Sequence, residues 1–144
     1  MTNRKTPDEY FKVKVQTAHR TELLLMLFDG AVRFVTLAQA HMARGEFEDK
    51  NRLFIKAQNI LLELIQTLDR KIGEALYGNL IGLYRFCYER LVNANMKNDA
   101  ASAQEALQIL EHLRETWQLA VKKYHEERAA AKPESADEHI CVEG

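Results

Sequence analysis

Histidines, cysteines and carboxylates are the residues of this chain that could bind a metal or carry out catalysis, and their spacing favours neither role. A di-iron site inside a helical bundle needs Glu-x-x-His pairs on two helices, and no glutamate here has a histidine three positions later. His139 and Cys141 could contact a metal, but two ligands make no closed site. The histidines fall in separate segments without a His-x-x-x-His pair: His19, His41, His112, His125 and His139. We therefore expect no metal and no cofactor.

Motifs of phosphate and ester chemistry are missing as well. The sequence has no glycine-rich phosphate loop and no Gly-x-Ser-x-Gly turn. Asp29–Gly30 would suggest a hairpin between strands, yet it lies within a helical pattern, where the glycine indicates close packing of helices. An enzyme is accordingly the least favoured class of function, and we expect no catalytic residue.

The composition is that of one soluble domain. The chain has 144 residues, 47% hydrophobic and 28% charged, with a formal net charge of -1, so it lacks the strong charge of a nucleic-acid binder. No run approaches the roughly 18 apolar residues of a membrane span, and the first twenty residues contain no signal-peptide core. With only two cysteines, the chain is not expected to be held together by a framework of disulfides. We expect a cytoplasmic protein that neither binds nucleic acid nor inserts into membranes.

Helical periodicity runs through most of the chain, and no segment alternates as a strand does. Gly45 and Gly73 are typical helix stops, and Asn98 or Asp99 is suited to cap a following helix. Short connections imply antiparallel neighbours, so the fold class is all-α, an antiparallel up-down four-helix bundle. The expected helices are residues 20–44, 48–72, 75–97 and 99–128.

The two ends differ from this bundle domain of residues 20–128. Residues 1–19 form a short segment that is too apolar for a pure linker and could cap the bundle. Residues 129–144 are rich in alanine and then acidic, and Pro133 is expected to stop the last helix. We expect a disordered acidic tail there.

Each helix supplies a stripe of apolar residues at spacings of three and four, which is first of all a bundle core. Gly78 and Gly82 share one face of the third helix, which indicates either a close helix neighbour or a frayed helix start. The expected core stripes are Leu23, Leu27, Ala31, Phe34 and Ala38, then Ala57, Ile60, Leu61, Leu64 and Leu68, then Leu80, Leu83, Tyr84, Cys87, Leu91 and Ala94, and finally Ala103, Leu107, Leu110, Trp117, Val121 and Tyr124.

The first two helices carry more apolar surface than one core can absorb. Ile55 and Leu62 fall on the far side of the second helix, and the first helix is apolar nearly all round. The protein's own ends, a second copy or a different chain could cover this surface, and all three remain open. Because Ile55 and Leu62 are seven residues apart, they suit a helix bound in a groove. The candidate partner-binding residues are Leu25, Phe28, Val32, Phe54, Ile55, Gln58, Leu62 and Ile65.

Four ordered blocks of this sequence resemble the FliS family of flagellin export chaperones, over Tyr10 to about Lys123. Together the blocks are specific, whereas any one of them alone is weak. They are Tyr10, Val15, Thr17 and Ala18, which match an N-terminal Tyr, Val and Thr-Ala; "ELLLMLFDGAVRF" at 22–34; "KAQNILLELIQTLDR" at 56–70; and "RLVNANMKND" at 90–99, with Trp117 in the last helix.

The resemblance implies a cytoplasmic helical bundle that binds the C-terminal region of flagellin, which is disordered in the monomer and helical in the filament. Such a chaperone blocks premature polymerisation and keeps flagellin competent for type III secretion. In this family the N-terminal segment can cover the binding surface, which would give Tyr10, Val13 and Val15 a cap role. The resemblance is also consistent with contacts to the flagellar export gate, and with a monomer or a weak homodimer. The alternative is a homodimeric adaptor bundle that binds another flagellar or regulatory protein.

The sequence departs from the family at the start of the first helix. The family has Thr-Ala-Ser-Pro-x-Glu there, with serine as N-cap and proline in the first turn. This chain has Thr17-Ala18-His19-Arg20-Thr21-Glu22. Either Thr17 or Thr21 caps instead, or the helix begins less sharply.

Overall fold

The computed structural model describes residues 20–143, and side chains as far as residue 131. Every regular element in that range is helical, as the periodicity predicts. The elements are α2 (Arg20–Ala43), α3 (Phe47–Thr67), a 3-10 helix η1 (Arg70–Ile72), α4 (Glu74–Lys97) and α5 (Ala100–Glu143). The chain divides into two compact units, one ending at Arg114 and one beginning at Glu115, and each is described by itself.

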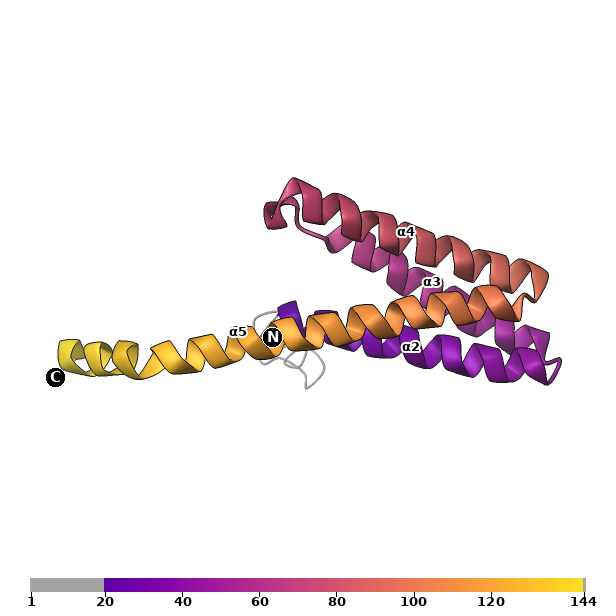
Figure 1. The fold of residues 1–144 in the computed structure, drawn as a ribbon. Coiled ribbons are helices and arrows are strands. Elements are labelled where there is room, and N and C mark those ends of the chain that lie inside the picture. The colour runs from indigo at the N-terminus through magenta and orange to yellow at the C-terminus, as the bar shows by residue number, and fades with distance from the viewer. Residues whose placement is uncertain (1–19, 144) are drawn as a thin grey trace, which may run out of the picture. The chain divides into compact units, whose positions relative to one another are not determined.

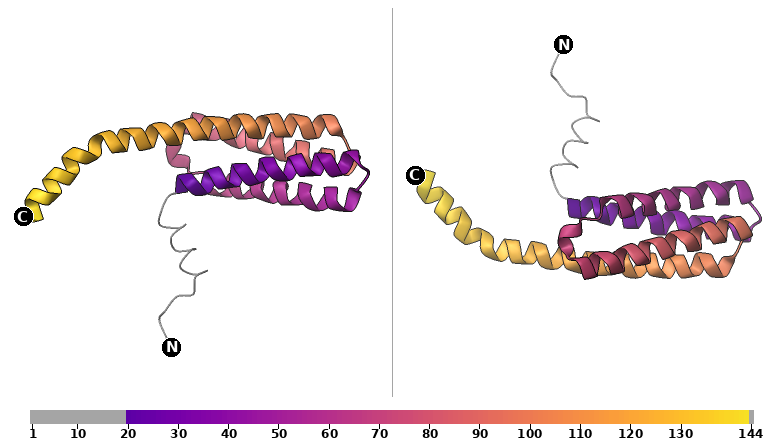
Figure 2. Two further views of the ribbon diagram at one scale, coloured as in Figure 1. Left: turned by 90° about the horizontal axis from the view of Figure 1, so that it is seen from below. Right: turned by 90° about the horizontal axis from the view of Figure 1, so that it is seen from above.

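The first unit is the predicted antiparallel four-helix bundle. It consists of α2, α3, α4 and residues 100–114 of α5 (Figure 1), and the turns that join α2 to α3 and α4 to α5 lie at the same end (Figure 2). Hydrogen bonds from side chains join three of the neighbouring pairs of helices. Gln39 of α2 donates to Gln104 of α5 (2.9 Å), Lys50 of α3 donates to the Asn95 carbonyl of α4 (2.7 Å), and Cys87 of α4 donates to the Ala106 carbonyl of α5 (3.6 Å).

The core stripe of α2 is rotated from the predicted one. Phe28, Val32 and Val35 are buried, whereas Leu23 is 41% exposed and Phe34 is only half-buried. The prediction was wrong because α2 is apolar nearly all round, so periodicity alone cannot decide which side faces the core. The remaining buried residues of α2 are Ala31 and Ala38, and Leu27 is half-buried.

The other stripes were predicted more closely, because polar residues fix their orientation. Ile60 and Leu68 of α3 are half-buried, and Leu83 of α4 is exposed although it was predicted to be core. In the second unit Val121 is buried, Trp117 is half-buried and Tyr124 is exposed. The core residues of α3, α4 and α5 in the first unit are Leu53, Phe54, Ala57, Leu61, Leu64, Leu80, Ile81, Tyr84, Cys87, Leu91, Ala94, Ala103, Ala106, Leu107, Leu110 and Leu113.

The turns follow the predicted chemistry. Gly45 (φ 73°) and Gly73 (φ 109°) adopt positive φ angles, which glycine adopts without a steric cost. Asn98 ends α4 in the left-handed conformation. Asp99 caps α5, since its carboxylate accepts from the backbone N–H of Ala101 at 3.0 Å. The Gly45 stop and the Asp99 cap are therefore confirmed. Gly73 ends the 3-10 helix η1, whereas α3, predicted to reach residue 72, already ends at Thr67.

The helical glycines divide into one confirmed and two corrected predictions. A Cβ on Gly30 would lie 3.3 Å from Ile60 Cδ1, so Gly30 does allow α2 and α3 to pack closely. A Cβ on Gly78 or Gly82 would meet nothing within 4 Å. No neighbouring helix of the described structure approaches α4 at these two residues, and the close-packing interpretation was wrong.

The two ends of the helical region also differ from expectation. Residues 1–19, including the predicted cap, lie outside the described residues. Thr21 is inside α2 and so is not its N-cap. The last helix was predicted to end at Arg128, whereas α5 continues to Glu143, and the expectation of a disordered tail stays a prediction. Pro133 removes one helical hydrogen bond without ending the helix, and the preceding Ala129–Ala131 are strong helix formers.

Candidate partner-binding surface

Three of the predicted partner-binding residues are in the bundle core. Phe28 and Phe54 are completely buried, and Val32 is 8% exposed. The Phe28 ring packs near the ring of Tyr84 in α4, with 6.3 Å between the two ring centroids. The predicted core stripe of the first helix omitted Phe28 and Val32, which was wrong, because the observed core stripe of α2 runs through them. These side chains offer no surface to a partner in this structure.

The remaining predicted residues do reach the surface, most clearly Ile55 (48% exposed) and Leu62 (40% exposed) of α3. Gln58 and Ile65 beside them are half-buried, as is Leu25 of α2. We call Ile55, Gln58, Leu62 and Ile65 the α3 surface.

The α3 surface points away from α2. Ile60 marks the side of α3 that faces α2, since it lies against Gly30. At about 100° per residue, Ile55 and Leu62 are roughly 140–160° around the helix from Ile60. Of the predicted partner-binding residues on α2 and α3, only Ile55 and Leu62 are exposed, and both lie on the side of α3 away from Ile60.

Sequence analysis missed a second apolar surface on α4. Leu76, Leu83 and Phe86 are 50%, 41% and 43% exposed. Leu83 lines a hollow of about 310 Å³ between α4 and α5, together with Glu105, Gln108, Ile109, His112 and Leu113. The leucine at 83 continues the apolar spacing of the core, so no signal in the sequence distinguishes it from a buried residue.

A buried lysine near the turn end of the bundle was also not predicted. Lys50 is 2% exposed, and its ammonium donates to the Asn95 carbonyl and lies 5.6 Å from the centroid of the Phe47 ring. Asn95 is in the last turn of α4, where carbonyls lack helical donors and a positive charge is favourable. Burial lowers the pKa of Lys50 below its ordinary value. We assign Lys50 a structural role as a cap for α4.

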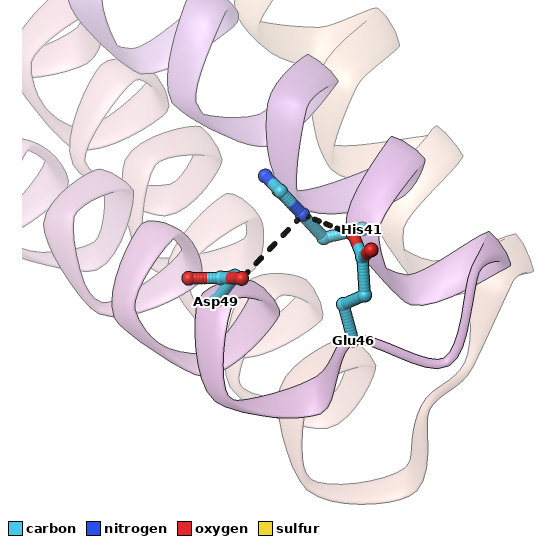
Figure 3. A group of neighbouring side chains, drawn as sticks. All are labelled: His41, Glu46 and Asp49. Atoms are coloured by element: carbon cyan, nitrogen blue, oxygen red, sulfur yellow. Dashed lines mark hydrogen bonds and ion pairs between the residues drawn. The ribbon is translucent and has the colours of Figure 1, made fainter.

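His41, Glu46 and Asp49 form the one group within the described residues whose composition could suit a metal ion (Figure 3). His41 Nδ1 lies 2.7 Å from Glu46 Oε1 and 3.9 Å from Asp49 Oδ2. The three come from the end of α2, the turn and the start of α3. They are close enough that metal binding has to be weighed against a simpler role.

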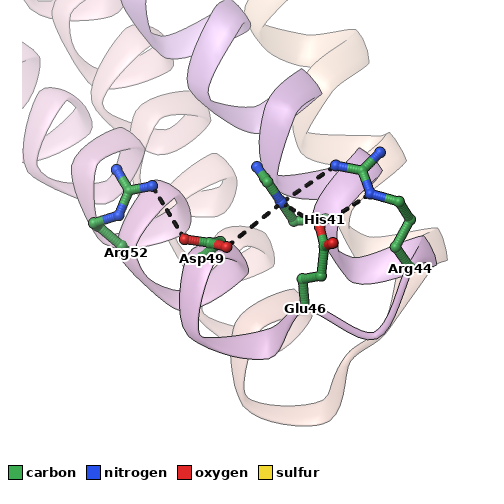
Figure 4. A network of polar contacts seen from close by, with 5 residues as sticks. All are labelled: His41, Arg44, Glu46, Asp49 and Arg52. Atoms are coloured by element: carbon green, nitrogen blue, oxygen red, sulfur yellow. Dashed lines mark hydrogen bonds and ion pairs between the residues drawn. The ribbon is translucent and has the colours of Figure 1, made fainter.

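Two arginines complete this group and favour an ion-pair network (Figure 4). Arg44 Nε donates to Glu46 Oε1 at 3.0 Å, and Arg52 Nη2 lies 3.4 Å from Asp49 Oδ1. The His41 ring and then Arg44 hydrogen-bond the Glu46 carboxylate, which lowers its pKa. The guanidinium groups thus occupy carboxylate oxygens that a metal would need, and we assign the network to the α2–α3 turn.

The thiol of Cys87 is not placed for nucleophilic chemistry. It is completely buried, and burial raises its pKa to about 12. A reactive cysteine needs an accessible thiolate. Cys87 is therefore a core residue of α4.

The helix α2 is long and apolar enough to cross a membrane by length and composition alone. The core helix of a soluble protein passes the same test. Phe28, Ala31, Val35 and Ala38 are all completely buried against the rest of the bundle, so we interpret α2 as a core helix.

Comparison with known proteins identifies the bundle. A sequence model described as "Flagellar protein FliS" matches residues 2–124. The chain belongs to the FliS family. Its last matched residue lies in α5, so the match includes all four helices of the bundle.

Individual FliS proteins agree with this assignment. The chain is 37% identical to the flagellar secretion chaperone FliS of Bacillus subtilis, with 83% of this chain and 88% of that protein covered. It is 33% identical to the protein of the same name in Salmonella typhimurium, with 72% and 77% covered. This FliS-family chain is therefore a chaperone of flagellar export and not an enzyme.

A solved structure supports the fold independently. It is described as a flagellar chaperone from bacteria, with a TM-score of 0.69 over 81% of this chain and 99% of that chain. At 17% sequence identity it shows a shared fold alone. The FliS-family bundle predicted from the four sequence blocks is thus confirmed.

Proposed function

We propose that this protein is a cytoplasmic chaperone that binds the disordered C-terminal region of flagellin, prevents its premature polymerisation and keeps it competent for type III secretion. The exposed pair Ile55 and Leu62 carries the proposal. Two apolar side chains two turns apart on a helix suit the apolar face of a helical partner. Membership of the FliS family supports flagellin as that partner.

Burial of the α3 surface would contribute to the ordering of a flexible segment. Burying one exposed leucine or isoleucine is worth about 1.5–3 kcal/mol. Ile55 and Leu62, with the half-buried Ile65, could together offset part of the entropy that a disordered segment loses on binding. Tyr10, Val13 and Val15 are proposed to cover this surface until flagellin replaces them.

Binding to a peptide from the C-terminus of the flagellin of the same organism tests this function. Leu62→Asp should weaken binding by at least tenfold, because it places a charge where an apolar contact forms. Ile65→Asp should act in the same direction. Thr67→Asp is the matched control, since Thr67 is exposed on the same helix and lies about 140° around it from Leu62.

Two results would contradict the proposal in different ways. If Leu62→Asp and Ile65→Asp fold normally and bind as wild type does, the α3 surface is not the site. If the unmodified chain does not bind the peptide at all, flagellin is not the partner, and the adaptor alternative is favoured.

A further inference from the structure

The outward side of α4 has no charge over almost three turns. Every residue between Glu74 and Arg85 is uncharged, and Leu76, Leu83 and Phe86 are 50%, 41% and 43% exposed. The solvent-facing side of a helix in a soluble bundle is ordinarily charged and polar. An uncharged side with several exposed large apolar residues is typical of an interaction surface.

The same side of α4 carries two glycines that packing within the described structure does not explain. A Cβ on Gly78 or Gly82 would meet nothing within 4 Å. Glycine is the poorest helix former after proline, so both residues weaken α4 without a close contact in return. Because neither has a side chain, and they are one turn apart, they leave a recess in the surface of the helix.

The residues around this recess have the spacing of a packing hole. When helices pack as knobs into holes, one side chain enters a hole formed by four residues of the facing helix. Ala75, Gly78, Asn79 and Gly82 have the spacing i, i+3, i+4 and i+7, and all four are exposed. Three of the four are alanine or glycine, so the hole has room for an aromatic ring.

Phe86 is an aromatic knob on the same side of the helix. It lies one turn beyond Gly82 and about 40° around the helix from it. We call Ala75, Gly78, Asn79, Gly82 and Phe86 the α4 face. A surface that carries both a knob and a hole for it is self-complementary, and a two-fold interface between identical chains requires such a surface.

We propose that two copies of this chain associate through the α4 face, with their α4 helices antiparallel about a two-fold axis at Gly82. Phe86 lies four residues after Gly82, and Gly78 lies four residues before it. Phe86 of each copy is therefore level with Gly78 of the other, and its ring enters the hole of that copy. The interface is separate from the α3 surface and does not depend on the proposed function.

The charges beside the α4 face favour the antiparallel arrangement. Arg85 and Glu74 are both exposed and lie about 20° apart around the helix, because eleven residues separate them. In the antiparallel pair, Arg85 of one copy is about 7.5 Å along the axis from Glu74 of the other, within reach of an arginine side chain. A parallel pair would place like charges level with each other. Glu89 is level with Glu74 of the second copy and weakens the attraction.

The association should be weak, because one side of one helix is smaller than the roughly 1,200 Å² interface of a stable complex. Sedimentation velocity of the full chain tests it from about 5 to 500 µM. The 16.6 kDa monomer should give way to a species of twice this mass, with a Kd on the order of 100 µM. A chain that stays monomeric over this range would overturn the inference.

Filling the hole should separate association from folding. Gly78→Gln should weaken the dimer by at least about tenfold and raise the melting temperature, because glutamine is the better helix former and has open space in the monomer. Phe86→Gln, which removes the knob, should weaken the dimer as much. Met96→Gln is the matched control, since Met96 is 77% exposed on the same helix but lies beyond the α4 face. It should change the Kd by less than twofold.

A charge swap tests the antiparallel register. Glu74→Arg and Arg85→Glu should each weaken the dimer by about threefold, and the double variant should restore the Kd to within twofold of wild type, since opposite charges face each other again. Glu89→Gln should strengthen the dimer. A double variant that is weaker than either single variant would show that the helices do not pair in this way.

Leu62→Asp distinguishes the α4 face from the α3 surface. It should leave the dimer unchanged, because Leu62 lies on α3. If Leu62→Asp abolishes the dimer while Phe86→Gln leaves its Kd within twofold of wild type, the copies meet through the α3 surface and the inference falls. Binding of the flagellin peptide is measured separately, so a chain that binds the peptide and stays monomeric keeps the proposed function and refutes the dimer.

Discussion

The two turns at the same end of the bundle are held by different chemistry. The α2–α3 turn carries an exposed network of His41, Arg44 and Glu46, in which the Arg44 and Glu46 side chains are 57% and 45% exposed. The α4–α5 turn is held by less exposed groups. Asp99 there accepts from Ser102 Oγ at 2.9 Å and from Asn93 Nδ2 at 3.2 Å.

Burial, rather than the number of ion pairs, should decide which turn contributes more to stability. Exposed ion pairs gain little, because water and salt screen the charges and long side chains lose entropy. A buried donor or acceptor that loses its partner costs the full desolvation of the group that remains. Ser102 is 2% exposed, and Lys50 reaches the end of α4 from within the core. We therefore expect the α4–α5 turn to be the more sensitive of the two.

The largest effect should come from Lys50→Met. The substitution removes the ammonium that donates to the Asn95 carbonyl and leaves this acceptor near the core without a partner. We expect a loss of about 1–3 kcal/mol in the free energy of unfolding, measured by urea denaturation. Lys56→Met is the control, since Lys56 is exposed on the same helix, and it should change stability by less than about 0.5 kcal/mol.

A gain in stability on Lys50→Met would contradict this expectation. It would mean that desolvation of the ammonium costs more than its contact with α4 returns, as happens for some buried charges. The comparison between the turns would then rest on the Asp99 cap alone.

The next largest effect should be the loss of folding stability at acidic pH that Asp99 causes at the α4–α5 turn. The Ser102 side chain, and then backbone N–H groups of Ser102 and Ala101, hydrogen-bond the Asp99 carboxylate and hold its pKa below the ordinary value of 3.8. Since the folded-state pKa is the lower one, the stabilisation is fully present above pH 3.8 and is lost as pH falls through the folded-state pKa.

Asp99→Asn isolates this contribution. Asparagine also caps helices well, so the melting temperature near neutral pH should change little, while the fall in stability below pH 3.8 should become shallower. Thermal melts across the acid range would show it, with Glu111→Gln as a control for the loss of one negative charge on α5. Identical acid profiles for wild type and Asp99→Asn would exclude Asp99 as the source.

The sequence predicted the number, order and antiparallel arrangement of the helices, because the Gly45 stop and the Asp99 cap act locally. It predicted the orientation of α4 well and of α2 poorly. The polar positions of α4 leave one apolar stripe, whereas α2 offers several, and only packing against its neighbours selects Phe28 and Val35 for the core. The same limit applies to the candidate site, where Ile55 and Leu62 were placed correctly on the surface and Phe28 was not.

Lys50 could not have been recognised from the sequence for a related reason. It is a charged residue whose importance depends on a group distant in the sequence. The acceptor for Lys50 is 45 positions away, and the burial of its side chain is visible only once the neighbouring helices are in place. Helical periodicity predicts which residues lie on the polar side of a helix, but not which of these a neighbouring helix buries.

The smallest effect should come from the α2–α3 network. Arg44→Ala removes the contact between Arg44 Nε and Glu46 Oε1 and should shift the melting temperature by less than about 2 °C. Gly45→Ala in the same turn is the informative comparison, because alanine at φ 73° costs about 1–2 kcal/mol. If Arg44→Ala destabilises the chain more than Gly45→Ala does, the exposed ion pairs and not the backbone of Gly45 hold this turn. Repeating both melts in high salt separates the two causes, since salt weakens the ion pairs and leaves the backbone strain unchanged.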